Sequence, residues 1–196
     1  SYAASTAVNI NLGLTTGQVS GGDASGDILQ NIEGVIGSNY ADTLTGNTSD
    51  NFFEGKLGAD VINGLGGSDT AIYVHSASAV SLNLGTATYT GGDAQGDTLT
   101  SIENLIGSAF NDTLIGDSNN NTLEGGAGAD MINGGTGTDT VSYASSNAGV
   151  TVNLSLTTAQ ISAGHASGDS LINIDDVLGS SYDDILSGGH ALYGGN

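Results

Sequence analysis

The chain has 196 residues, of which 33 are glycine and none is proline or cysteine. It carries 21 acidic residues and a single basic one, Lys56, which gives a formal net charge of −20. The lack of cysteine excludes disulfides and thiolate metal sites, and a nucleic-acid partner is not expected for so acidic a chain. No run of about 18 apolar residues is present, so we expect no membrane span. At 37 % hydrophobic residues the chain can form a core, but its charge calls for cations from outside.

Three similar tracts, 1–36, 73–106 and 143–178, begin with the same alternation of apolar and polar residues. This alternation predicts a half-buried β-strand in each tract. The apolar residues are Val8, Ile10 and Leu12, then Val80, Leu82 and Leu84, then Val150, Val152 and Leu154. A second short strand is expected in each tract, centred on Val19, Tyr89 and Ile161 respectively. We interpret the three tracts as coils with longer loops.

The same tracts share a longer motif with a period of 70 to 72 residues. Residues 22–27 read Gly-Asp-Ala-Ser-Gly-Asp, and close copies lie at 92–97 and 164–169. Each copy ends in an aspartate, and a tyrosine also recurs in register; we expect the tyrosines to pack the coil rather than bind sugar. These residues are Asp27, Asp97 and Asp169, with Tyr2, Tyr73 and Tyr143. The period predicts one continuous solenoid fragment over 1–196, cut from a longer array.

A nine-residue period fills the remaining tracts, 37–72, 107–142 and 179–196. Two adjacent copies at 125–133 and 134–142 read Gly-Gly-Ala-Gly-Ala-Asp-Met-Ile-Asn and Gly-Gly-Thr-Gly-Thr-Asp-Thr-Val-Ser. The sixth residue is aspartate and the eighth is apolar, and imperfect copies keep Asp or Asn at the sixth position. The sixth-position residues are Asp42, Asn51, Asp60, Asp69, Asp112, Asn121, Asp130, Asp139 and Asp184.

This nonapeptide resembles the RTX, or haemolysin-type calcium-binding, repeat. The resemblance implies an all-β fold, a right-handed parallel β-roll or β-helix solenoid, with Ca²⁺ held between stacked turns. It also implies two nonapeptides per coil, so that turns eighteen residues apart lie on top of each other. The stacked pairs would be Asp42 with Asp60, Asn51 with Asp69, Asp112 with Asp130, and Asn121 with Asp139.

The residue types suit calcium, which takes six to eight oxygen ligands. Glycines at the first, second and fourth positions permit positive φ and let main-chain oxygens crowd inward. The glycines expected to line ion sites are Gly55, Gly58, Gly125, Gly128, Gly134 and Gly137. Asp27, Asp97 and Asp169 either extend the series of ligands or only solvate the surface, and the sequence leaves both interpretations open. Asp23, Asp50, Asp93 and Asp117 are expected to be solvated loop charges.

Several departures from the repeat pattern predict unequal sites. Asn51 and Asn121 are neutral, so their sites should be weaker, and Lys56 stands where a turn glycine is usual. The turns 37–42 and 107–112, like 179–184, keep only the first glycine and the aspartate. Their ability to present main-chain oxygens is therefore in question.

We expect a calcium-binding structural module rather than an enzyme, since no H-E-x-x-H or G-x-S-x-G motif occurs. The resemblance implies type I secretion and an extracellular location on the surface of a bacterium, as part of an adhesin, S-layer or filament. The alternatives are a folding and secretion module of a secreted protease or lipase, and a carbohydrate- or ice-binding module. Expected partners are several calcium ions, with copies of the chain end to end and surface glycans as further candidates.

Overall fold

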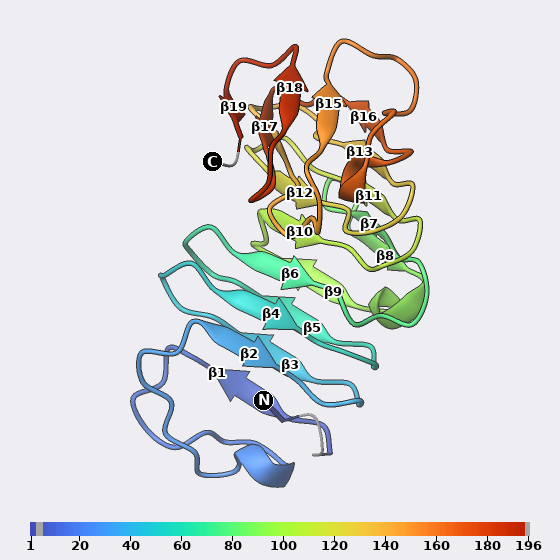
Figure 1. Cartoon of the computed structure of the whole chain (residues 1–196). Helices are drawn as coiled ribbons and strands as arrows, with labels where there is room; N and C mark the ends of the chain where they lie inside the picture. Colours follow the sequence, from blue (N-terminus) through green and yellow to red (C-terminus); the bar gives the residue numbers. More distant parts are fainter. Residues whose placement is uncertain (3–5, 195–196) are drawn as a thin grey trace.

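The computed structural model describes residues 1–2 and 6–194, and nearly all of its regular elements are three-residue β-strands (Figure 1). The chain alternates short strands with tight turns, and strands stack in parallel from coil to coil. For example, β3 (Thr43–Thr45) pairs in parallel with β5 (Val61–Asn63), the strand eighteen residues later. This is a parallel β-roll, as the resemblance implies. In the part of the chain that the structure describes, no helix is long and apolar enough to cross a membrane.

One side of the roll is a single eight-stranded parallel sheet that continues through the whole stack. Its inward-facing residues come from the nonapeptides and from the ends of the inserted tracts. In spatial order its strands are β2 (Gly34–Ile36), β4 (Phe52–Glu54), β6 (Thr70–Ile72), β10 (Asn104–Ile106), β12 (Thr122–Glu124), β14 (Thr140–Ser142), β17 (Asp176–Leu178) and β19 (Leu192–Tyr193).

The opposite side is divided into three separate sheets. The first contains β1 (Asn9–Asn11), β3, β5 and β9 (Thr98–Thr100). The second contains β8 (Thr88–Thr90), β7 (Ser81–Asn83), β11 (Thr113–Ile115), β13 (Met131–Asn133) and β16 (Ser170–Ile172). The third contains β15 (Thr151–Asn153) and β18 (Ile185–Ser187). Only β7 and β8 pair antiparallel among the described strands.

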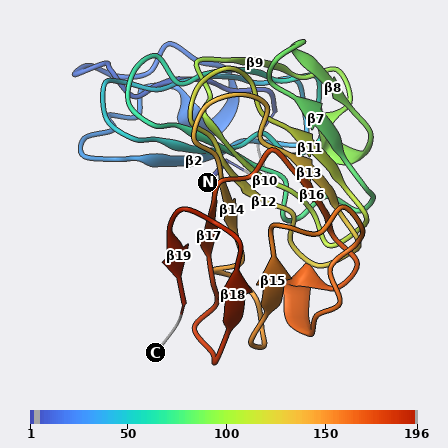
Figure 2. The same ribbon diagram turned by 90° about the horizontal axis from the view of Figure 1, so that it is seen from above.

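The division arises because each inserted tract adds a strand to this side alone. β9 stacks on β5, whereas β7, which comes earlier in the chain, stacks beneath β11. The same exchange happens one repeat later, where β16 stacks on β13 and β15 stacks beneath β18. One period therefore contributes four parallel strands (β7, β9, β11, β13) to the divided side and three (β10, β12, β14) to the continuous sheet, and the extra strand is accommodated because β9 ends one sheet and β7 begins the next. Seen from above, the coils with β15 and β18 are displaced from the coils beneath them (Figure 2).

The core is a thin layer formed by the central residue of each strand. Ile10, Leu82 and Val152 are fully buried, so the predicted alternation in the inserted tracts is confirmed. The apolar eighth positions of the nonapeptides also point inward. They are Leu44, Phe53, Ile62, Ala71, Leu114, Leu123, Ile132 and Val141, all at most 1 % exposed. A strand of three residues with one buried side chain gains little alone, so the roll depends on stacking between coils.

The predicted second strand forms only in the middle tract, as β8 around Tyr89; the prediction is wrong for Val19 and Ile161. In the first and third tracts a glutamine side chain forms the hydrogen bonds that the second strand forms in the middle tract. Gln18 accepts the Asn11 N–H at 2.8 Å and donates to the Asn11 carbonyl at 3.0 Å. Gln160 bonds Asn153 in the same way, at 2.8 and 3.1 Å. Val19 and Ile161 consequently point outward and are 85 % and 90 % exposed.

A single 3₁₀ turn follows in each tract and carries the recurring Gly-x-Ala sequence. These turns are η1 (Gly22–Ala24), η2 (Gly92–Ala94) and η3 (Gly164–Ala166). Each buries its alanine completely, so the loop is fixed to the coil before the chain returns to the roll.

Candidate metal centre

Acidic side chains form a row along one edge of the roll, where the turns lead from the eight-stranded sheet to the opposite side. Each carboxylate accepts the main-chain N–H of the acidic residue one coil earlier. Asp60 Oδ1 accepts from Asp42 at 2.8 Å, and Asp97 Oδ1 accepts from Asp60 at 2.9 Å. The next repeat has the same bonds, from Asp112 to Asp130 at 2.8 Å and from Asp130 to Asp169 at 2.9 Å. We call this the first row.

A second row follows the opposite edge of the roll. Asn51 donates its main-chain N–H to Asp69 Oδ1 at 2.7 Å, and Asp69 donates to Glu103 Oε2 at 2.9 Å. In the next repeat Asn121 donates to Asp139 Oδ1 at 2.9 Å, and Asp139 donates to Asp175 Oδ2 at 3.0 Å. All four stacked pairs implied by the resemblance are therefore in direct contact.

Stacking of the turns brings the negative carboxylates of each row close together where they are buried from water. The pKa of Asp60 is raised from 3.8 to about 7, chiefly by burial and also by the neighbouring carboxylates of Asp97 and Asp42. Burial likewise raises the pKa of Asp130 to about 7, with Asp169 and Asp112 adding to the effect. Hydrogen bonds from the main chain oppose these shifts without cancelling them. Without a cation, the rows therefore disfavour their own ionised form.

Three of these carboxylates have an oxygen with no partner. Oδ2 of Asp60, Asp69 and Asp130 makes no hydrogen bond, although the three residues are 0 %, 0 % and 1 % exposed. An unsatisfied buried charge costs several kcal/mol in an interior of low polarity. Oxygens of this kind fit a hard cation such as Ca²⁺.

The turn glycines surround these oxygens closely. A Cβ on Gly55 or Gly125 would collide with Oδ2 of the aspartate of the same turn. A Cβ on Gly134 would lie 2.5 Å from Asp139 Oδ2. No larger residue fits at these first positions, which is why the repeat requires glycine there.

The fourth-position glycines approach main-chain oxygens of the coil below. A Cβ would lie 2.7 Å from the Tyr40 oxygen at Gly58, and 2.6 Å from the Phe110 oxygen at Gly128. At Gly137 the Asn119 oxygen would be 2.6 Å away. All three glycines have positive φ, between 137° and 145°. Carbonyl oxygens and carboxylates thus converge between stacked turns.

Main-chain oxygens are needed to complete an ion site here. Among the described residues, no group of three or more His, Asp or Glu side chains could hold a metal by itself. Calcium readily accepts main-chain carbonyls alongside carboxylates, whereas zinc prefers nitrogen and sulfur. The donor set therefore fits calcium.

Two aspartates of the inserted tracts, Asp97 and Asp169, join the first row, but a tyrosine takes their second oxygen. Tyr73 donates its hydroxyl to Asp97 Oδ2 at 2.8 Å, and Tyr143 donates to Asp169 Oδ2 at 2.9 Å. Both tyrosines pack the coil and are at most 2 % exposed. Burial raises the pKa of Asp97 and of Asp169 to about 6, because it outweighs these hydrogen bonds.

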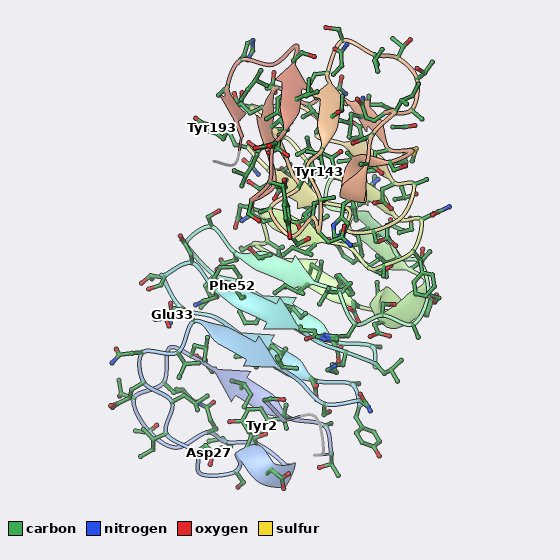
Figure 3. The ribbon with its side chains drawn as sticks, in the orientation of Figure 1. Tyr2, Asp27, Glu33, Phe52, Tyr143 and Tyr193 are labelled. Atoms are coloured by element: carbon green, nitrogen blue, oxygen red, sulfur yellow. The ribbon has the colours of Figure 1, made fainter. Side chains whose placement is uncertain are left out.

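At the N-terminal end, Tyr2 donates its hydroxyl to Asp27 Oδ2 at 3.0 Å, and both residues are more exposed there (Figure 3).

In each repeat, the first aspartate of the first row accepts from the main-chain N–H of a valine rather than from that of another acidic residue. Val8 donates to Asp42 Oδ1 at 2.7 Å, and Val80 donates to Asp112 Oδ1 at 2.7 Å. Val150 donates to Asp184 Oδ1 at 2.9 Å. The rows are therefore interrupted wherever an inserted strand begins.

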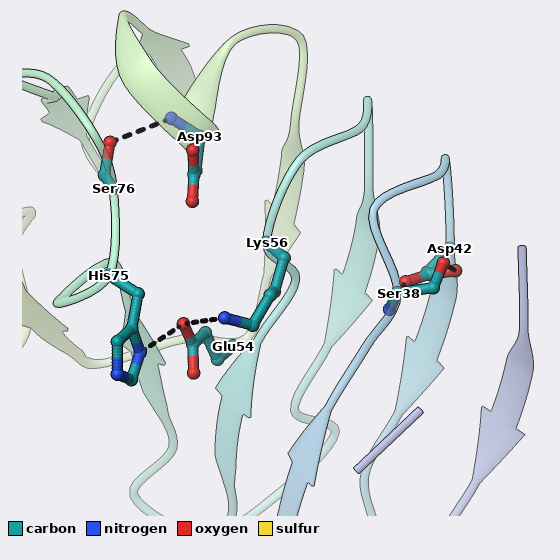
Figure 4. Close-up of polar contacts among 7 residues, drawn as sticks. All are labelled: Ser38, Asp42, Glu54, Lys56, His75, Ser76 and Asp93. Carbon is teal, nitrogen blue, oxygen red and sulfur yellow. Dashed lines mark hydrogen bonds and ion pairs between the residues drawn. The ribbon is translucent and has the colours of Figure 1, made fainter. Parts of the chain in front are cut away.

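Lys56 lies beside a small polar cluster at the edge of β4 (Figure 4). Its Nζ is 3.4 Å from Glu54 Oε1, and His75 Nδ1 lies 2.8 Å from the same oxygen. Asp93 is 8 % exposed and its main-chain N–H donates to Ser76 Oγ at 3.1 Å. The prediction that Asp93 is a solvated loop charge is wrong, because η2 folds it against the roll near Lys56.

Sequence reasoning missed the serines of the imperfect turns. Ser38 Oγ donates to Asp42 Oδ1 at 2.8 Å, and Ser108 Oγ donates to Asp112 Oδ1 at 2.8 Å. Ser180 Oγ donates to Asp184 Oδ1 at 2.7 Å. Their recurrence at the same place in all three repeats was the available signal.

Comparison with known proteins agrees with this geometry. The sequence model of the RTX calcium-binding nonapeptide repeat matches four copies, at residues 36–71 and 106–141. These ranges contain the turns that hold Asp42 to Asp69 and Asp112 to Asp139. No curated protein matches the chain. The chain therefore contains RTX calcium-binding nonapeptide repeats, wound as a parallel β-roll.

Proposed function

We propose that this chain is a structural module whose folding depends on calcium. The observation that carries the proposal is the set of buried carboxylate oxygens without a partner at Asp60, Asp69 and Asp130. With a net charge of −20 and one lysine, the sequence offers almost no cation of its own. A bound ion would neutralise the rows, so its binding free energy becomes folding free energy.

The chain's residues would act as a scaffold of oxygen ligands. The aspartates supply charge, and the glycines let main-chain oxygens of two coils approach the same point. Calcium accepts such irregular shells of six to eight oxygens, whereas Mg²⁺ demands a smaller octahedral shell and keeps its water. We therefore expect selectivity for calcium over magnesium.

We place the module outside the cell, in a secreted protein of a bacterial surface such as an adhesin, S-layer or filament, without catalytic activity. The recurrence of 70- to 72-residue copies supports a repetitive structural role. Extracellular calcium modules bind with Kd of about 10⁻⁴ to 10⁻³ M, which leaves them empty in the cytosol and filled outside. Further copies of the chain and surface glycans are the proposed partners besides calcium.

A calcium titration followed by circular dichroism tests the proposal. We expect a cooperative gain of β signal with calcium, little change with the same concentration of magnesium, and reversal by a chelator. A β signal that is complete without calcium and indifferent to the chelator would contradict it.

A further inference from the structure

The turns of the two rows are of two kinds, and the difference lies in the second residue. In the first row, Ser38 donates its main-chain N–H to Asp42 Oδ2 at 2.6 Å. Ser108 donates in the same way to Asp112 Oδ2. The serine hydroxyls donate to these carboxylates as well, and a valine amide reaches Oδ1 from below. Both carboxylate oxygens of Asp42 and of Asp112 thus have protein donors.

Two turns of the second row are closed in the same manner. Asn47 donates its main-chain N–H to Asn51 Oδ1 at 2.8 Å, and Asp117 donates to Asn121 Oδ1 at 2.8 Å. None of these second residues has positive φ. We call 37–42, 46–51, 107–112 and 116–121 the closed turns.

The turns one coil later have the opposite geometry. Their second residues all have positive φ: Lys56 at 75°, Leu65 at 71°, Gly126 at 94° and Gly135 at 96°. The N–H groups of Leu65 and Gly135 turn back to the side-chain oxygens of Asn63 and Asn133, each at 3.1 Å. We call 55–60, 64–69, 125–130 and 134–139 the open turns.

In the open turns the N–H of the second residue points away from the aspartate, so the carboxylate lacks the donor that it has in the closed turns. The three carboxylate oxygens without a partner, on Asp60, Asp69 and Asp130, all belong to open turns. The closed turns contribute something else, because their main-chain oxygens face the open turns. The oxygens of Tyr40 and Phe110 lie against Gly58 and Gly128 of the turns above.

We propose that only the open turns give a carboxylate to calcium, one ion for each, and that the closed turns give main-chain oxygens alone. This rests on the proposed function and assigns its sites: Asp60, Asp69, Asp130 and Asp139 are ligands, whereas Asp42 and Asp112 are held by protein donors. The sequence agrees with the assignment. All four open turns have aspartate at the sixth position, whereas two of the four closed turns have asparagine.

The test compares substitutions at stacked positions in the whole chain. Asp130→Asn removes a free carboxylate from an open turn, and Asp112→Asn makes the same change in the closed turn directly beneath it. Asparagine keeps an acceptor for the Ser108 N–H, as Asn121 does for Asp117, but its amide nitrogen would face the Val80 N–H, so the ion count rather than the midpoint decides the comparison. Bound calcium is counted by native mass spectrometry, and the midpoint of the calcium titration is measured by circular dichroism.

We expect four ions on the unsubstituted chain and also on Asp112→Asn, although this variant loses the acceptor of the Val80 amide and some stability with it. Asp130→Asn should carry one ion fewer and have a midpoint raised several-fold. Asp60→Asn and Asp42→Asn give the same comparison in the other repeat, in case Asp130→Asn does not fold.

An ion lost from Asp112→Asn or Asp42→Asn would overturn the assignment, and so would four ions on Asp130→Asn or Asp60→Asn, or more than four on the unsubstituted chain. A chain that binds no calcium at all would instead contradict the proposed function. The two failures can therefore be told apart.

Discussion

The side-chain amide of Asn121 donates to the main-chain oxygen of Glu103, 2.8 Å away and one coil earlier. The oxygen of the same amide accepts from the Asp117 N–H, so both ends of this side chain, which is 2 % exposed, are hydrogen-bonded. Asn51 occupies the corresponding place in the previous repeat, but its Nδ2 has no partner. The neutral residue at 121 thus makes a contact that a carboxylate could not make.

Asn121→Asp should therefore destabilise the calcium-loaded protein by about 1–3 kcal/mol, because it sets a carboxylate against a carbonyl oxygen. Asn51→Asp is the matched control and should lower the free energy of unfolding clearly less, because the Asn51 amide has no such bond to lose. Urea unfolding in saturating calcium measures both. Equal losses in the two variants would show that the bond to Glu103 contributes nothing.

Leu65→Gly should stabilise the calcium-loaded form by about 1 kcal/mol. Leu65 adopts a φ of 71°, which is unfavourable by roughly 1–2 kcal/mol for a residue with a Cβ, and its side chain is half exposed. Leu57→Gly is the control, since Leu57 is equally exposed but does not have positive φ; it should destabilise. Thermal unfolding in calcium compares them, and a loss of stability in both would refute the strain at Leu65.

Gly125→Ala should abolish the ion site of its turn and raise the calcium midpoint, because the new Cβ would meet Oδ2 and Cγ of Asp130. Gly66→Ala is the control, since nothing lies within 4 Å of a Cβ there. The control should be neutral or slightly stabilising. A calcium titration by circular dichroism measures both midpoints, and an unchanged midpoint for Gly125→Ala would mean that the crowded oxygens do not bind the ion.

Tyr143→Phe should destabilise the protein by about 1–3 kcal/mol, because Asp169 Oδ2 would lose its hydroxyl donor inside the coil. Tyr182→Phe serves as the control, since Tyr182 is 48 % exposed. Denaturant unfolding in calcium should show the loss in the first variant alone. No loss at Tyr143 would mean that water or an ion replaces the hydroxyl without cost.

Acid should stabilise the compact form of the calcium-free chain. The folded-state pKa values of Asp60 and Asp130 are raised from 3.8 to about 7, and those of Asp97 and Asp169 to about 6. Since the folded form binds these protons more tightly, their stabilising effect is complete below about pH 4 and is lost as pH rises through 7. The calcium-free chain should have a smaller hydrodynamic radius at pH 5 than at pH 8.

Protons and calcium compete for the same carboxylates, so calcium affinity should rise between pH 5 and pH 8. Dynamic light scattering after removal of calcium and titrations at both pH values measure the two effects. A calcium-free radius that is the same at pH 5 and pH 8 would contradict the raised pKa values.

The roll and its stacked pairs could be predicted from the sequence because a fixed period fixes the register. Residues nine apart alternate between the two edges, so residues eighteen apart must stack, and Asp112 meets Asp130 as expected. The buried eighth positions follow from the same period, even where Ala71 replaces a larger residue.

The difference between open and closed turns could be predicted only where glycine stands second, as at Gly126 and Gly135, because all these turns keep glycine first and Asp or Asn sixth. It depends on the φ of the second residue, and Lys56 and Leu65 adopt positive φ although neither is glycine. The missing strands at Val19 and Ile161 have a similar origin, since a glutamine side chain can imitate a strand's hydrogen bonds. Such choices depend on tertiary contacts that a local pattern does not contain.

The break between β9 and β7 has a consequence for shape. β9 ends one sheet and β7 begins the next, so each inserted tract offsets the divided side while the eight-stranded sheet runs on unbroken. Tandem copies would form a column with one continuous face and one stepped face, with a step every 70 to 72 residues.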